Sequence, residues 1–222
     1  MTPGGLRERK KQRMYEVVSD IAVRLFLARG FDAVSVAEVA AAAEISKPTL
    51  FRYFPAKEDL VLYRIADHED EAARVVAGRA APLAALKAHF LEGLERGDPI
   101  TGISDHPSVL AFHRLLYGTP SLVARMYGHL ERSEAALAEA LGGDGDARLA
   151  AGQIVAVQRI LAQDNFRRIT AGESVAEVRA DAVVAAERAF QRLEDGLSGL
   201  SGLSGLSESR GSGGSGAASG AE

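Results

Sequence analysis

Residues 35–54 read SVAEVAAAAEISKPTLFRYF. Ser35 precedes an Ala-rich run and is followed three positions later by Glu38, a capping-box spacing in which each side chain satisfies an exposed amide at a helix start. Ser46 then precedes Pro48, and proline suits the first turn of a helix because its missing N–H would have no helical partner there. The stretch therefore predicts two short helices joined by a tight turn.

The remaining chain also follows the helical period, since its apolar residues recur three and four positions apart. The pattern predicts an all-α fold of about nine helices, over residues 6–29, 35–43, 46–54, 56–78, 82–96, 106–117, 120–141, 146–171 and 175–195. We expect a helix-turn-helix domain over residues 1–56 and a larger helical domain, for ligand binding and dimerisation, over residues 57–196. Residues 197–222 are rich in Gly and Ser, which predicts a disordered tail.

Composition excludes several classes of protein. The chain has 222 residues, a formal charge of −4 and no Cys, so disulfide frameworks, thiolate nucleophiles and iron–sulfur sites are excluded. Neither an apolar run long enough to span a membrane nor a signal peptide is expected, and the predicted location is the cytoplasm. The charge is unevenly distributed: residues 1–57 carry a net charge of +4, which leaves −8 for the rest. A basic end on an acidic body suits contact with a polyanion, although a solvated charged helix start is the alternative.

The start of the second short helix carries residues that can read DNA. Lys47 can donate to guanine, the ring of Pro48 can contact a thymine methyl group, and the Thr49 hydroxyl can meet a base edge or a phosphate. These three are the predicted base contacts. The predicted phosphate contacts are the helix-start amides at Ser35 and Ser46, the cations Arg52 and Lys57, and Tyr53 at the flank of the helix. The alternative is that the aromatic residues are core and the lysine is solvated.

Residues 25–60 resemble the DNA-binding domain of the TetR family of bacterial transcriptional regulators, with matching segments at residues 25–31, 35–40, 45–54 and 57–60. The resemblance implies an all-α homodimer, usually a repressor, that a small molecule releases from a palindromic double-stranded operator. Two positions depart from the family pattern. Phe51 stands where the family commonly has Tyr, which makes that phosphate contact apolar, and Glu44 replaces a Gly that often ends the second helix.

The second half of the chain resembles a TetR subgroup associated with acyl-CoA-like ligands, including mycofactocin-type regulators. The resemblance rests on residues 105–115, 120–122 and 137–141, and it implies a small apolar ligand such as an acyl-CoA. Aromatic residues among small ones leave room for an apolar cavity. The predicted lining is Phe90, Phe112, His113, Leu116, Tyr117, Met126, Tyr127 and Phe166. For any one of these residues, filling the core is an equally good interpretation.

The last two predicted helices carry apolar stripes that we expect to pair with their symmetry mates in a homodimer. The predicted interface residues are Ile154, Val157, Leu161, Val178, Ala182, Ala185, Ala189 and Leu193.

Catalysis has no candidate residues in this sequence. His106 and His113 could share a helix face, but no third ligand stands at a spacing typical of metal sites, and no nucleophile elbow or phosphate-binding loop is present. We expect no metal, no cofactor and no enzymatic activity. The alternative to a DNA-binding regulator is a helical small-molecule-binding protein or enzyme whose basic N-terminus only aids solubility.

Overall fold

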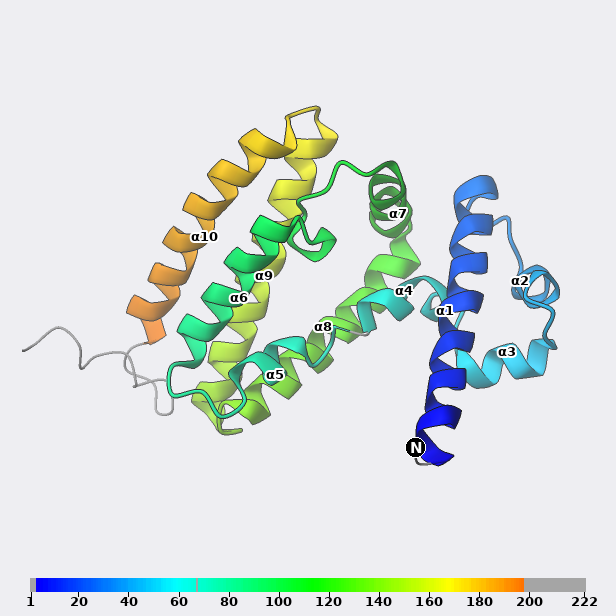
Figure 1. Ribbon diagram of the computed structural model, residues 1–222, viewed down its shortest axis with the longest axis horizontal. Helices are drawn as coiled ribbons and strands as arrows, with labels where there is room; N and C mark the ends of the chain where they lie inside the picture. The colour runs from blue at the N-terminus through cyan, green and yellow to red at the C-terminus, as the bar shows by residue number, and fades with distance from the viewer. Residues whose placement is uncertain (1–2, 67, 198–222) are drawn as a thin grey trace, which may run out of the picture.

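The computed structural model describes residues 3–66 and 68–197, and these residues form an all-α fold without strands, as the sequence predicts (Figure 1). None of the described helices is long and apolar enough to cross a membrane. The predicted tail lies outside the described residues from residue 198 onward, whereas Leu197 is the buried last residue of the final helix. The helices are α1 (Pro3–Arg29), α2 (Val36–Ala42), α3 (Lys47–Tyr53), α4 (Asp59–Ala66), α5 (Glu71–Val76), α6 (Pro82–Arg96), η1 (Pro99–Thr101, a 3-10 turn), α7 (Pro107–Gly118), α8 (Pro120–Ala140), α9 (Gly145–Thr170) and α10 (Val175–Leu197).

The helix expected over residues 56–78 is in fact two helices, which makes ten α-helices instead of nine in the described chain. Neither Gly nor Pro marks the break between α4 and α5. Carboxylates mark it instead: Glu69 faces Arg132 and His129 of α8, and Glu71 contacts His89 of α6. The break is therefore stabilised by contacts with distant helices, and local propensity does not predict it.

Two apolar clusters form the core. The N-terminal cluster joins α1, α2, α3 and α4 to parts of α7 and α8, whereas the C-terminal cluster joins α5, α6, α9 and α10 to the other end of α8. Helix α8 thus runs from one cluster to the other, with Leu122 and Met126 in the first and Leu137 and Ala138 in the second (Figure 1). The middle of α8 lies between the two cores.

The apolar stripes of α9 and α10 face largely inward, which corrects the predicted dimer surface at four of its eight residues. Four of the eight predicted interface residues are buried within the single chain: Ile154, Val178, Ala182 and Leu193. Val157 and Leu161 pack against the same core, Ala189 is half-buried and Ala185 is exposed. The stripes are the faces by which α10 packs on α6 and α9, because burial within one subunit uses the same periodic pattern as burial between subunits.

Candidate nucleic-acid interface

Helix α3 presents its first turn to solvent. Ser46 caps the helix, its side-chain oxygen accepting a hydrogen bond from the Thr49 amide at 3.2 Å. Lys47 and Pro48 are exposed, as two of the predicted base contacts must be. One turn further, the Phe51 ring is 40% exposed and lies 5.8 Å from Lys47 Nζ. Lys47 and the exposed ring of Phe51 therefore lie side by side on the solvent side of α3. A cation and an aromatic ring in this arrangement can contact base edges and the sugar–phosphate backbone.

Thr49 differs from its two neighbours. It is half-buried, and its hydroxyl lies 2.8 Å from the Ser46 hydroxyl, so it belongs to the cap of its own helix. A side chain engaged in this way presents its methyl group more readily than its hydroxyl. Its predicted role as a hydroxyl contact to DNA would therefore require that the bond to Ser46 be shared or broken.

Arg52 and Tyr53 end the helix differently from each other. Arg52 is exposed, with its guanidinium carbon 5.4 Å from the Tyr53 ring. Tyr53 is half-buried and meets Tyr15 of α1 edge-on, with ring centroids 5.2 Å apart. The tyrosine thus fixes α3 on α1, while the arginine is left free to face a phosphate.

Lys57 points inward in this structure. Its Nζ donates a 2.6 Å hydrogen bond to the carbonyl oxygen of Phe31 and lies 4.3 Å from the centre of the Phe31 ring. This contact ties the segment before α4 to the loop between α1 and α2. The predicted role as a phosphate contact stays a prediction, and the geometry adds a structural role that the sequence did not indicate.

The predicted capping box of α2 is present in full. Glu38 N–H donates to Ser35 Oγ at 3.2 Å, and Ser35 N–H donates to Glu38 Oε2 at 2.8 Å. The backbone and hydroxyl of Ser35, with Arg29 2.8 Å away, lower the pKa of Glu38 to about 2. The carboxylate stays ionised at neutral pH, so the Ser35 end of α2 is held rigidly and carries an anion that a nearby phosphate would have to avoid.

The turn between α2 and α3 contains the one non-glycine residue with positive φ in the described chain, Glu44, at 55°. Its amide donates to the Ala41 carbonyl oxygen at 3.1 Å. The left-handed conformation that glycine adopts freely is therefore required here, and the chain uses a glutamate for it.

The predicted ligand-pocket residues do not form one group. Phe90 lies in the C-terminal cluster, 6.2 Å from Phe190, whereas Phe112, Leu116 and Met126 belong to the N-terminal cluster. Tyr127 is exposed and lies beside Arg159.

A second group forms around His113, whose imidazole is stacked 3.9 Å from the Phe166 ring and 5.7 Å from the Tyr117 ring and meets the Phe112 ring edge-on at 6.4 Å. Burial lowers the pKa of His113 to about 4, and its Nδ1 has no hydrogen-bond partner among the described residues.

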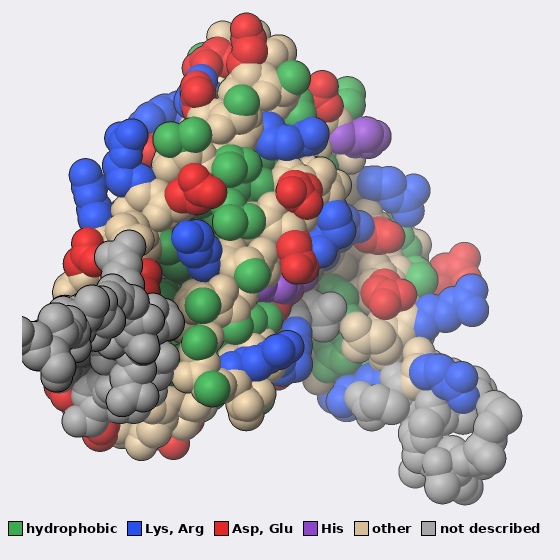
Figure 2. Space-filling model, turned by 60° about the vertical axis from the view of Figure 1, so that its left-hand side comes forward, with side chains coloured by type: hydrophobic (Ala, Val, Ile, Leu, Met, Phe, Trp, Pro, Cys, Tyr) green, Lys and Arg blue, Asp and Glu red, His purple; other side chains and the backbone are tan. Residues whose placement is uncertain are grey.

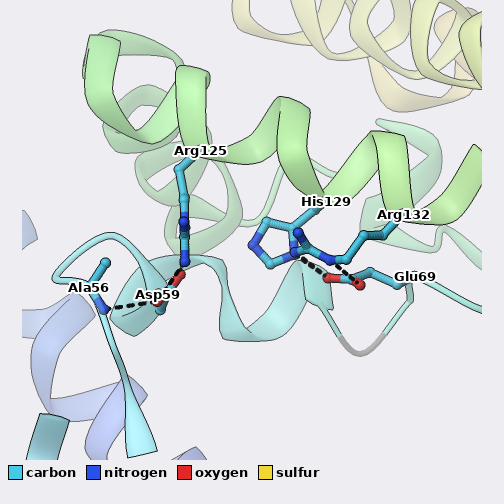
Figure 3. A network of polar contacts seen from close by, with 6 residues as sticks. All are labelled: Ala56, Asp59, Glu69, Arg125, His129 and Arg132. Carbon is cyan, nitrogen blue, oxygen red and sulfur yellow. Dashed lines mark hydrogen bonds and ion pairs between the residues drawn. The ribbon is translucent and has the colours of Figure 1, made fainter.

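A polar network in the middle of α8 was not predicted (Figure 3). Arg125 donates to both carboxylate oxygens of Asp59, at 2.9 and 3.1 Å, and Arg132 donates to both oxygens of Glu69, at 2.8 and 3.0 Å. His129 Nδ1 contacts the same Glu69 carboxylate. The signal in the sequence is the spacing of four and three along α8, which places these side chains on one helix face. Among the described residues, no group of three or more His, Cys, Asp or Glu side chains could hold a metal ion.

Comparison with known proteins accounts for the N-terminal region. Residues 19–63 match the family model described as bacterial regulatory proteins, tetR family. Over 139 residues the chain is 32% identical to the HTH-type transcriptional regulator TcmR of Streptomyces glaucescens, an alignment that covers 60% of this chain and 61% of TcmR. A shorter match, 52% over 40 residues, reaches MftR of Mycobacterium tuberculosis, a protein named for mycofactocin biosynthesis, and covers 18% of this chain and 20% of MftR.

Two solved structures share the architecture at low sequence identity. The TetR-family regulator SCO0857 of Streptomyces coelicolor has a TM-score of 0.57 at 21% identity, covering 84% of this chain and 96% of the other. NalD, the secondary repressor of the MexAB-OprM multidrug efflux pump in Pseudomonas aeruginosa, has a TM-score of 0.54 at 16% identity, with the same coverage. Residues 19–63 thus match the tetR family of bacterial regulatory proteins, and the described chain shares the fold of the solved TetR-family regulator SCO0857.

Proposed function

We propose that this protein is a sequence-specific DNA-binding transcriptional repressor that acts as a homodimer and is released from a palindromic operator by a small apolar ligand. The observation that carries the proposal is the open surface of α3, where Lys47, Pro48, Phe51 and Arg52 face solvent on a helix held by a serine cap and by Tyr53. The tetR-family match over residues 19–63 supports it. Such a repressor would act in the cytoplasm, where its operator lies.

The first experiment is an electrophoretic mobility shift with the DNA that flanks the protein's own gene. We expect a sequence-dependent shift at moderate salt. Lys47→Ala should reduce discrimination between operator and random DNA by about 1–3 kcal/mol, which is the contribution of one good base contact. The matched control is Arg192→Ala, which removes an exposed cation on α10, far along the chain from the reading helix.

Two outcomes would contradict the proposal. Absence of any sequence-dependent shift would favour the helical small-molecule-binding protein or enzyme. If Lys47→Ala weakens binding to specific and random DNA equally, the protein would still be a DNA-binding protein, but Lys47 would not contact bases.

The face that we propose for dimerisation is the outer side of α9 and α10, opposite the buried stripes. Leu149 and Ile160 on α9 are 62% and 48% exposed, and Val184 on α10 is 52% exposed. Figure 2, which brings the α10 side of the molecule forward, has hydrophobic side chains along the middle of this face among charged ones. Large apolar side chains that are exposed on the outer side of a helix pair favour association. Val184→Glu should therefore yield helical monomers in a sizing experiment, and a persistent dimer would place the interface elsewhere.

The ligand part of the proposal has less support. The predicted lining residues divide between two clusters, and the choice of an acyl-CoA rests on the resemblance stated for the second half of the chain. A panel of acyl-CoAs, fatty acids and aromatic compounds should be titrated against the operator complex. Coupling of about 1–3 kcal/mol would weaken DNA binding 5- to 150-fold. If no compound weakens the complex or raises the melting temperature, a ligand from these classes is contradicted.

A further inference from the structure

Helix α4 is held at both ends by side chains of α8. At its start, Arg125 makes the two-bond ion pair with Asp59 described above, and Asp59 Oδ2 also accepts a 2.9 Å hydrogen bond from the Ala56 amide (Figure 3). Just beyond its end, Glu69 receives two bonds from Arg132 and one from His129. One face of α8 therefore contacts the start of α4, beside the DNA-reading unit formed by α1–α3, and the segment before α5, beside the body formed by α5, α6, α9 and α10.

These contacts lie where α8 passes from one apolar cluster to the other. Arg125 adjoins Met126 of the N-terminal cluster, whereas His129 and Arg132 lie in the interval before Leu137 of the C-terminal cluster. Apolar contacts tolerate sliding, whereas a two-bond arginine–carboxylate pair has one favourable geometry. His129 is buried and Asp59 is largely shielded, at 15% side-chain exposure, so part of the network is protected from solvent.

Charge favours the paired state. Burial by itself raises the pKa of Glu69, but hydrogen bonds from Arg132 and His129 outweigh it and leave the pKa below its usual value. The carboxylate is therefore ionised at neutral pH and continues to attract α8. The arginine of each pair is about half exposed, so each pair adds modestly to the free energy of unfolding, and its main effect lies in setting the orientation of α4.

We propose that Asp59, Glu69, Arg125, His129 and Arg132 form a two-point latch that sets the angle between the DNA-reading unit and the body. They are positioning residues, since they lie on α4, on α8 and in the segment between α4 and α5, and none of them belongs to α3. The latch determines the distance between the two reading helices of a dimer, and thus the operator spacing that the protein prefers. The operator part of this inference rests on the proposed function.

The key variant is Arg125→Gln, which removes the ion pair but leaves Asp59 in place to accept from Ala56. Arg125→Lys keeps the charge and loses the fork, and Arg192→Gln on α10 is the matched control. Because the chain has no Cys, spin labels can be attached at Ala41→Cys and Arg188→Cys, two exposed positions on α2 and α10. Dilution with unlabelled protein leaves one labelled chain in each dimer, so the distance measured lies within a subunit.

We expect a narrow distance distribution for the otherwise unaltered protein and for Arg192→Gln, a broadened or shifted one for Arg125→Gln, and partial recovery for Arg125→Lys. On DNA, Arg125→Gln should lose roughly fivefold or more in affinity for the preferred half-site spacing, and clearly less for an isolated half-site. Melting temperatures and helix content should stay close to those of the parent because Arg125 is about half exposed. If Arg125→Gln destabilises the fold, Arg132→Gln serves as the second variant at the other contact point.

An unchanged distance distribution in both arginine variants would overturn the latch. If Arg125→Gln broadens the distribution of distances between the spin labels but leaves the preferred half-site spacing unchanged, the link between the latch and the operator would be overturned. If the unaltered protein binds no specific DNA, the proposed function fails, while the distance measurement still decides whether the latch exists.

Discussion

Helices α3 and α10 both carry conspicuous patterns in the sequence, but the patterns mean different things in the structure. In α3 the signals are local: a serine cap and a proline in the first turn, both found as expected. In α10 the signal is an apolar stripe, and the stripe faces the subunit's own core. A local signal specifies its own geometry, whereas a periodic stripe says that a face is buried without saying against what. Four experiments can test this contrast.

The largest effect is expected from a charge placed on the inner face of α10. Val178 is fully buried, so Val178→Glu should destabilise the fold by about 4 kcal/mol or more. Urea unfolding followed by circular dichroism measures this loss. Val184→Glu on the outer face is the matched control and should keep its helix content. A well-folded monomer for Val178→Glu would return this residue to the dimer interface.

The second effect is a pH dependence that arises from His113. Burial holds the pKa of His113 in the folded protein at about 4, against an ordinary value of 6.5, so between these pH values only the unfolded chain takes up the proton. Stability should therefore be full above pH 6.5 and should fall on acidification, by up to about 1.4 kcal/mol for each pH unit, down to about pH 4.

His113→Gln should remove this part of the pH slope in urea unfolding. His106→Asn is the control, because it removes an exposed histidine at the start of α7 and keeps a side chain that can cap the helix. If the free energy of unfolding depends on pH with the same slope in the parent and in His113→Gln, the imidazole would be accessible to protons in the folded state.

The third effect tests the local signal in α3. Ser46→Ala removes the cap from the reading helix and should cost about 1 kcal/mol in the free energy of unfolding. Ser46→Asn should restore most of the loss because asparagine also caps well. Operator binding should weaken with Ser46→Ala and recover with Ser46→Asn. Equal stability of all three proteins would mean that contacts with α1 alone hold the helix.

The smallest expected effect is an increase in the free energy of unfolding. Glu44 has a φ of 55°, and Glu44→Gly should raise the free energy of unfolding by about 0.5 kcal/mol, since glycine adopts this conformation without a steric cost. Gly30→Ala, at a φ of 91°, should lower stability by a comparable or larger amount. Thermal unfolding of the pair measures both changes, and a loss on Glu44→Gly would mean that the side chain makes a stabilising contact.

The predicted functional residues also differ in whether local or distant contacts decide their position. Lys47, Pro48 and Arg52 are exposed because helix capping and the position of Pro48 decide where α3 begins, and the sequence states both. Lys57 could not be placed in the same way, because its partner is the Phe31 carbonyl oxygen 26 positions earlier. The sequence predicts that the Thr49 hydroxyl contacts DNA, whereas in the structure this hydroxyl is hydrogen-bonded to the Ser46 hydroxyl.

The sequence by itself determined the fold class, the boundaries of most helices and the residue at which α3, the proposed reading helix, begins. These features depend on caps, turns and a helical period, which act within a few residues. Tertiary structure alone decided that the α4–α5 segment breaks, that the stripes of α9 and α10 face inward, and that Asp59 and Glu69 meet α8. Those outcomes depend on pairs of residues about 60 positions apart and on which of several apolar faces is buried against which. Neither can be predicted from the residues within a few positions along the chain.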